Sequence, residues 1–258
     1  IRANAVEDYK EHKIIPFFKD YCGYKALHNG SKNYDVIVVG SDQVWTPWSL
    51  PTKFYNLLFV DDNVRKVAYA SSFGVSVIPK FQRKATGAYL DRFYSIGVRE
   101  TVVADPTMLL SPEEWMNEIK DSKVDESEPY IFCYFLGANK EARVAANHLK
   151  EATGYKIITL RHMDEYVPSD EQFGDEAPYN VNPNDFLKYI CGAAYVLTDS
   201  FHCSAFSIQF KRKFMTFYRF KSSSKVSRNS RIDSLLGIFG LQERLYQGDI
   251  LFLKKTLA

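Results

Sequence analysis

The sequence predicts an α/β protein whose strands form parallel sheets. Short apolar runs, typical of strands that are covered on both faces, alternate along the chain with segments of helical periodicity. Strands that alternate with helices in this way lie parallel in their sheet. The polar and charged stretch at 121–128 interrupts the alternation. We therefore expect two domains, residues 1–122 and 129–258, a division that suits a chain of 258 residues.

Two strands of the first domain end in polar turns. They are expected at 34–39 and 66–70, and the polar residues that follow them are Asp42, Gln43, Ser71 and Ser72. Asp42 and Gln43 would project where a sugar hydroxyl can bind. An ordinary glycine turn with a helix cap would give the same pattern, so both interpretations stay open.

A third strand of this domain is expected at 95–100, with Arg99 near its end. The guanidinium of Arg99 suits bidentate contacts with a carboxylate or a phosphate. Pairing with a carboxylate on the surface is the alternative. A further strand is expected at 102–104, and the pair Ser111 and Pro112 is typical of the start of a helix.

The second domain repeats the alternation of strand and helix. Its strands are expected at 130–136, 155–160, 194–197 and 213–218. Its helices are expected at 140–152, 183–191 and 203–210, and from 229 onward. Ligands of open parallel sheets bind outside the carboxyl ends of the strands, so the binding residues are expected there.

The stretch at 193–207 is the strongest candidate for a site. Its apolar strand ends abruptly at Asp199 and Ser200, and a helix follows. The start of a helix presents N–H groups and partial positive charge, which suit a phosphate or a carboxylate. His202 lies among these donors and can give a hydrogen bond or a proton. A capping serine followed by a histidine that merely closes the turn is the alternative.

Several cations follow other strands of the second domain. Arg161 and His162 end the second strand, and Arg219 ends the last. Because the carboxyl ends of parallel strands share one edge of a sheet, we expect these side chains beside His202. Arg231, at the start of the final helix, points either into the same site or into solvent.

Composition and charge exclude several classes of function. Lys and Arg total 33 against 31 for Asp and Glu, and no run of like charge resembles a nucleic-acid arm or a polybasic membrane anchor. Neither GxGxxG nor GxxxxGK(S/T) occurs, which removes the main support for a dinucleotide site or a P-loop. No apolar run approaches the roughly 20 residues of a membrane-spanning helix, and no signal peptide opens the chain. We therefore expect a cytoplasmic protein.

The four cysteines form no CxxC pair and no spacing that suits zinc. We expect them to be free thiols and expect no metal site. Cys203, at the start of a helix, is the one whose surroundings favour a lowered pKa.

Six motifs occur in order along the chain. They are GSDQVW at 40–45, YASSFG at 69–74, GVRE at 97–100, DPTMLL at 105–110, TDSFHC at 198–203 and NSRIDSLL at 229–236. Together, over about residues 34–245, they resemble the polysaccharide pyruvyl transferase family. The resemblance implies a glycosyltransferase-B-like fold, in which two Rossmann-like domains have parallel sheets that face a cleft. It also implies transfer of the enolpyruvyl group of phosphoenolpyruvate to sugar hydroxyls as a ketal, with no metal or nucleotide cofactor.

The resemblance also suggests a role for each domain, with the acceptor bound by the first and the donor by the second. His202 is the expected proton donor, Asp42 would orient or deprotonate the acceptor hydroxyl, and Asp199 is the alternative base. The residues expected to hold the substrates are Arg99, Ser200, the helix start at Cys203, Arg219, Arg231, Gln43, Ser71 and Ser72. Arg99 and His202 would meet across the cleft and hold the two negative ends of the donor.

Three features depart from the family pattern. Cys203 stands where the family usually has glycine, the opening strand of the family is absent, and Glu100 runs almost directly into the strand at 101–105 where the family has a helix. The last two predict an N-terminal domain that is incomplete in this chain. A nucleotide-sugar glycosyltransferase of the same fold and a non-catalytic saccharide-binding relative are the alternatives. The expected partners are phosphoenolpyruvate and a saccharide or lipid-linked saccharide, whose lipid would bring the protein to a membrane surface; no nucleic acid is expected.

Overall fold

A computed structural model describes residues 2–49, 53–75, 77–99, 104–124, 127–161, 166–220 and 229–248. The chain forms two compact units. We call residues 18–109 the small unit, and residues 1–17 together with 110–258 the large unit. Three predicted features lie outside the described residues: His162, most of the strand at 102–104, and the basic loop at 221–228.

The units divide the chain at a different place from the predicted boundary at 122–129. Residues before that boundary pack on the large unit: the rings of Trp115 and Phe206 lie 5.1 Å apart, and Ile119 is completely buried. The hydroxyl of Ser122 donates to Asp185 at 2.7 Å. The polar stretch at 121–128 therefore belongs to the large unit, because apolar contacts hold the helix before it on that unit. These contacts are not evident in the sequence, since most residues of the helix are polar or charged.

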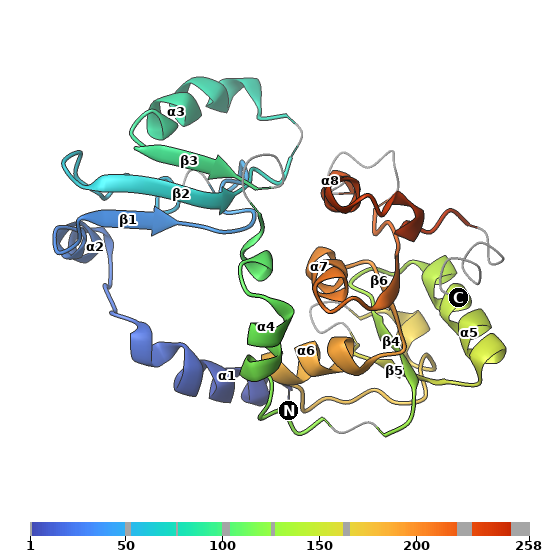
Figure 1. The fold of residues 1–258 in the computed structure, drawn as a ribbon. Helices are drawn as coiled ribbons and strands as arrows, with labels where there is room; N and C mark the ends of the chain where they lie inside the picture. The colour runs from blue at the N-terminus through green and yellow to red at the C-terminus, as the bar shows by residue number, and fades with distance from the viewer. Residues whose placement is uncertain are drawn as a thin grey trace. The chain divides into compact units, whose positions relative to one another are not determined.

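The small unit contains one parallel sheet with the strand order β1-β2-β3 (Figure 1). Its elements are α2 (Tyr24–Ser31), β1 (Val36–Val39), β2 (Arg65–Ser71), α3 (Lys80–Leu90), β3 (Ser95–Val98) and the 3-10 turn η3 (Pro106–Met108). Trp45 is fully buried in its core, where its ring packs on Phe73 at 5.5 Å and on Phe93 at 5.8 Å. Trp45 follows Asp42 and Gln43 closely in the chain, so its packing anchors the end of the turn that carries them.

The large unit contains a parallel sheet with the strand order β5-β4-β6-β7 (Figure 1). Its strands are β4 (Tyr130–Tyr134), β5 (Lys156–Thr159), β6 (Tyr195–Thr198) and β7 (Lys213–Thr216). Its helices are α1 (Arg2–Lys13), α4 (Pro112–Glu118), α5 (Lys140–Thr153), α6 (Pro183–Gly192), α7 (Phe201–Gln209) and α8 (Ser230–Phe239), with 3-10 turns η1 (Ile15–Phe17), η4 (Pro168–Asp170) and η5 (Gln242–Arg244).

Both faces of this second sheet are covered, as the continuous apolar runs of its strands predict. Helix α5 packs against β4, β5 and β6, and α7 packs against β6 and β7. Side chains from β4 such as Ile131, Phe132 and Cys133 are completely buried. The predicted α/β fold with two parallel sheets is confirmed. None of the helices in the described ranges is both long and apolar enough to cross a bilayer.

Candidate functional site

The turn after β6 starts a helix, as predicted. Ser200 caps α7, and its hydroxyl accepts a hydrogen bond from the backbone N–H of Cys203 at 3.4 Å. The hydroxyl of Thr198, at the end of the strand, accepts in turn from the N–H of Ser200 at 3.0 Å. Two local side-chain contacts therefore fix the backbone where the strand becomes a helix.

Asp199 ties this turn to the neighbouring strand. Its two carboxylate oxygens accept hydrogen bonds from the backbone N–H groups of Leu136 at 2.6 Å and Gly137 at 2.9 Å, in the loop after β4. Burial raises the pKa of Asp199, and the two backbone N–H groups and the nearby Arg219 oppose that rise. The carboxylate therefore joins the ends of two adjacent strands.

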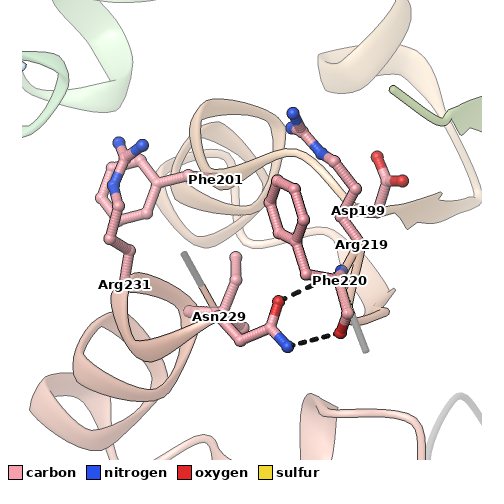
Figure 2. A pocket seen from close by; sticks show the side chains of 7 residues that line it. Asp199, Phe201, Arg219, Phe220, Asn229 and Arg231 are labelled. Atoms are coloured by element: carbon pink, nitrogen blue, oxygen red, sulfur yellow. Dashed lines mark hydrogen bonds between the residues drawn. The ribbon is translucent and has the colours of Figure 1, made fainter. Parts of the chain in front are cut away.

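A pocket opens beside this turn, with about 360 Å³ of empty volume including the part open to solvent. We call it the arginine pocket, and its lining residues are Asp199, Phe201, Arg219, Phe220, Asn229, Arg231 and Ile232 (Figure 2). The guanidinium of Arg231 lies over the ring of Phe201 at 4.4 Å, and that of Arg219 lies 5.6 Å from the ring of Phe220. Two guanidinium groups against one carboxylate leave the pocket with net positive charge, which suits an anionic ligand.

An amide side chain holds the wall of this pocket in place. Asn229 donates to the carbonyl of Phe220 at 2.7 Å and accepts from its N–H at 3.4 Å (Figure 2). The end of the chain segment after β7 is thereby paired with the start of α8. This contact brings Arg219 and Arg231 to one pocket although they lie on different elements.

The structure brings together part of the predicted site. Asp199, Arg219 and Arg231 line one pocket, whereas His202 and Ser200 stand at the start of α7 and do not line it. His202 is partly buried, with its ring edge-on to Phe201 at 5.4 Å. Sequence reasoning missed Phe201, Phe220 and Asn229 as lining residues, although Phe201 follows Ser200, Phe220 follows Arg219 and Asn229 lies two residues before Arg231. The roles assigned to these residues stay predictions.

The predicted environment of Cys203 is wrong. Its side chain is completely buried, and burial raises the pKa of its thiol to about 12, although the helix start was expected to lower that pKa. Loss of hydration outweighs the helix start because the thiol faces the core of the unit. The side chain of Cys203 does not line the arginine pocket, and its backbone N–H donates to the hydroxyl of Ser200.

Arg161, predicted on the same edge of the sheet, lies elsewhere. Its guanidinium donates to the hydroxyl of Tyr179 at 3.1 Å and to the carbonyl of Glu171 at 3.0 Å. It does not line the arginine pocket. In this structure Arg161 therefore holds together the segments that follow β5.

A second group of charged side chains lies at the strand ends of the small unit. The side chain of Arg99 is completely buried, and its Nη1 atom lies 2.8 Å from Oδ1 of Asp42 and 3.2 Å from Oδ2 of Asp105. Asp105 also accepts from the N–H of Thr107 at 3.1 Å. Arg99 therefore pairs with carboxylates, but its side chain is buried and the pairing is not the surface contact that the alternative described. In this structure its guanidinium is enclosed by two carboxylates and not offered to a soluble anion.

Asp42 stands in an unusual backbone conformation at this edge. It has φ of 67°, in the left-handed region that non-glycine residues rarely adopt, and its side chain is 43% exposed. Its N–H donates to the carbonyl of Ala70 at 3.1 Å, and its carbonyl accepts from Ser72 at 2.8 Å. Strained residues of this kind cluster at functional sites. An exposed carboxylate fixed by a buried arginine can accept a hydrogen bond from a hydroxyl.

The serines predicted beside Asp42 differ in their access. Ser71 is completely buried, and its hydroxyl donates to the carbonyl of Val39 at 3.3 Å, so in this structure its side chain supports the fold, and its assignment as a ligand-binding residue stays a prediction. The side chain alternates into the core because it lies on β2. Ser72 is partly exposed, and its hydroxyl accepts from the N–H of Gly74 at 3.1 Å. The side chain of Gln43 packs against Gly74, because a Cβ atom added at Gly74 would lie 2.8 Å from Oε1 of Gln43.

The structure thus has a cationic, aromatic-lined pocket at the strand ends of a parallel α/β sheet, the edge at which proteins of this fold class bind their ligands. The comparisons with known proteins are more specific. A family model for polysaccharide pyruvyl transferase matches residues 2–219, and the chain belongs to this family. The protein is accordingly of a transferase family. No match was found among curated proteins.

Two solved structures resemble the fold at low sequence identity. The putative UDP-N-acetylglucosamine 2-epimerase from Listeria monocytogenes is 11% identical, with 92% of this chain and 72% of that chain covered and a TM-score of 0.51. The UDP-GlcNAc 2-epimerase from Methanocaldococcus jannaschii is 12% identical, with 91% and 74% covered and a TM-score of 0.49. The first supports the predicted glycosyltransferase-B-like fold and nothing beyond the fold.

Proposed function

We propose that this protein transfers the enolpyruvyl group of phosphoenolpyruvate to two hydroxyls of a sugar in a polysaccharide or its precursor. The product is a pyruvate ketal, and inorganic phosphate is released. The observation that carries the proposal is the arginine pocket, in which Arg219 and Arg231 come together at the strand ends of a chain from the pyruvyl transferase family.

The arginine pocket has the chemistry that the donor requires. Phosphoenolpyruvate carries a carboxylate and a phosphate, and each suits a bidentate contact with a guanidinium group. The rings of Phe201 and Phe220 flank the two arginines and reduce their contact with water, which strengthens their attraction for an anion. The start of α7 adds partial positive charge beside the pocket.

The reaction needs one proton donor and a base for the acceptor. A proton from His202 adds to C3 of phosphoenolpyruvate, and the oxygen of one sugar hydroxyl forms a bond to C2 and gives up its proton. The bond between C2 and the phosphate oxygen then breaks, phosphate leaves with the electron pair, and a second hydroxyl oxygen takes its place. One hydroxyl proton balances the proton delivered to C3, and the other leaves with phosphate. We assign the base to Asp42, whose carboxylate is 43% exposed and is oriented by Arg99.

The acceptor in this proposal is a free or lipid-linked saccharide, and a lipid-linked one would bring the protein to a membrane surface. The test is incubation with phosphoenolpyruvate and a set of galactose- and mannose-terminated acceptors. We expect release of inorganic phosphate that depends on the acceptor, and a pyruvyl mass increment on one acceptor. Loss of both signals in Arg219→Ala and His202→Ala would support the assignment, with the His202 variant slowed about 10²–10⁴-fold as for a lost general acid. Transfer from a nucleotide sugar in place of phosphoenolpyruvate would refute it.

A further inference from the structure

We infer that Gly137 and Arg143 are positioning residues for Arg219, and that Asp199 acts with them as an anchor for the same loop and not as a base. The inference rests on the proposed function, because Arg219 is taken to hold the donor. It concerns the loop at 135–139 between β4 and α5.

The loop is held from both sides by buried charges. The carboxylate of Asp199 accepts hydrogen bonds from two N–H groups of the loop, that of Leu136 at 2.6 Å and that of Gly137 at 2.9 Å. The guanidinium of Arg143 donates to its carbonyl oxygens, those of Gly137 at 3.0 Å and Asn139 at 2.9 Å. Charge-assisted hydrogen bonds of this kind are the strong ones, so the loop backbone has little freedom.

Arg143 is itself fixed within the unit. Its side chain is 6% exposed, and its Nε atom donates to Asp170 at 2.6 Å. Its guanidinium lies over the rings of Phe135 at 5.2 Å and Phe173 at 5.9 Å. Its hydrogen-bond partners are Asp170 and two carbonyl oxygens of the loop, whereas its Nη2 atom is buried and makes no hydrogen bond to the described residues. Arg143 contributes nothing to the lining of the arginine pocket, so its contact with that site runs through the loop.

Arg219 rests on the bare backbone of Gly137. A Cβ atom added at Gly137 would lie 2.7 Å from Cγ of Arg219 and 3.0 Å from Oδ2 of Asp199. The backbone φ of this glycine is outside the positive range that other residues avoid, so glycine is needed for the close approach alone. Asn139 adds a second contact, since its side chain donates to the carbonyl of Tyr218 at 3.3 Å. The loop therefore contacts both the stem of Arg219 and the residue before it.

The first test is Gly137→Ala, with Gly237→Ala as the matched control. Gly237 lies in α8 of the same unit, where an added Cβ has nothing within 4 Å. We expect phosphoenolpyruvate to bind Gly137→Ala at least about tenfold more weakly by calorimetry, because a displacement of order 1 Å disrupts aligned contacts. The control should bind as the wild type does. Equal affinity in Gly137→Ala and the wild type would overturn the inference.

A double-variant cycle shows whether the effect passes through Arg219. In an Arg219→Ala background the alanine at 137 no longer meets Cγ of Arg219, and Oδ2 of Asp199 at 3.0 Å is the close atom that remains. Gly137→Ala should therefore lower the free energy of unfolding in that background by less than about half of its effect in the wild type. An equal loss of stability in both backgrounds would mean a general distortion of the loop and would overturn the inference.

A donor-independent readout separates this inference from the proposed function. Modification of Arg219 by phenylglyoxal, followed by peptide mass spectrometry, reports the setting of its guanidinium without any substrate. We expect its rate to change at least about threefold in Gly137→Ala and in Arg143→Lys, and an unchanged rate in both variants would overturn the inference. If the modification rate changes in both variants but the wild type does not bind phosphoenolpyruvate, the proposed function fails and the positioning of Arg219 stands.

Asp199→Asn distinguishes an anchor from a base. Asn presents an NH₂ group to a backbone donor, so it should disturb the loop, raise KM for phosphoenolpyruvate and leave the shape of the pH profile of kcat unchanged. Loss of the acidic limb of that profile with KM unchanged would assign Asp199 as the base and overturn this part of the inference.

Discussion

Replacement of Cys203 by glycine tests whether this departure from the family pattern impairs the protein. If the thiol crowded the donor, Cys203→Gly would restore binding, and a non-catalytic relative would become the better interpretation. The structure indicates the opposite, because the side chain is completely buried and does not line the arginine pocket. The thiol contributes to the core of the large unit instead.

The expected cost of Cys203→Gly follows from two losses. Removal of a fully buried side chain of this size costs about 1 kcal/mol of transfer free energy. Glycine within α7 adds roughly 0.5 kcal/mol through its lower helix propensity. We therefore expect the free energy of unfolding of the large unit to fall by about 1–2 kcal/mol, before any cavity term.

Urea unfolding followed by circular dichroism measures this loss, and calorimetry with phosphoenolpyruvate measures the affinity. We expect reduced stability together with affinity within about twofold of the wild type, because the replaced group makes no contact with the arginine pocket. Cys203→Ala is the control, since it removes the thiol and keeps helix propensity. Unchanged stability combined with a large gain in affinity or turnover in Cys203→Gly would refute the reasoning.

Three further predictions concern single residues. Iodoacetamide at pH 8 should label the exposed Cys22 in the folded protein and should leave Cys203 unmodified until urea unfolds the large unit. Peptide mass spectrometry would show which thiols are labelled, and rapid labelling of Cys203 in the native state would contradict its burial. Burial lowers the pKa of Lys66, so the folded chain releases this proton at lower pH than the unfolded chain, and the free energy of unfolding should rise with pH in the alkaline range below the ordinary pKa of 10.5. Urea unfolding at several pH values should show a flatter rise for Lys66→Met than for the wild type, and an identical pH dependence in both proteins would count against this prediction. Ser111→Ala removes the capping box of α4 and should lower the stability of the large unit by about 1 kcal/mol, whereas no change would show that the cap is not needed.

Local patterns predicted the strands and helices well. The run at 194–197 corresponds to β6 (Tyr195–Thr198), and the caps at Ser111 and Ser200 are present because such caps depend only on residues within one turn. The edge of the sheet that carries Asp199 and Arg219 was also predictable, since parallel topology alone places strand ends together.

Features that depend on packing between distant segments could not be predicted in this way. Arg99 was expected to hold a donor anion, but Asp42 and Asp105 enclose it, and their approach is set by the fold of the small unit. The close contact between Gly137 and Arg219 joins residues that follow two different strands, and no local pattern marks it. The packing of the helix at 112–118 on the large unit was not predictable either, because the contact that Trp115 makes with Phe206 joins distant segments and charged residues flank Trp115 in the sequence.

The most direct test of the central claim is thermal unfolding of the wild type and of Arg219→Ala with and without phosphoenolpyruvate. A ligand that binds only the folded state stabilises it by about 2.7 kcal/mol at a concentration of 100 Kd. We predict that phosphoenolpyruvate raises the melting temperature of the wild type and of an Arg212→Ala control, whose guanidinium donates to the carbonyl of Phe210 at 2.8 Å at the far end of α7. Arg219→Ala should show little or no shift. An equal shift in Arg219→Ala, or stabilisation of the wild type by nucleoside diphosphates and not by phosphoenolpyruvate, would contradict the claim that the arginine pocket holds this donor.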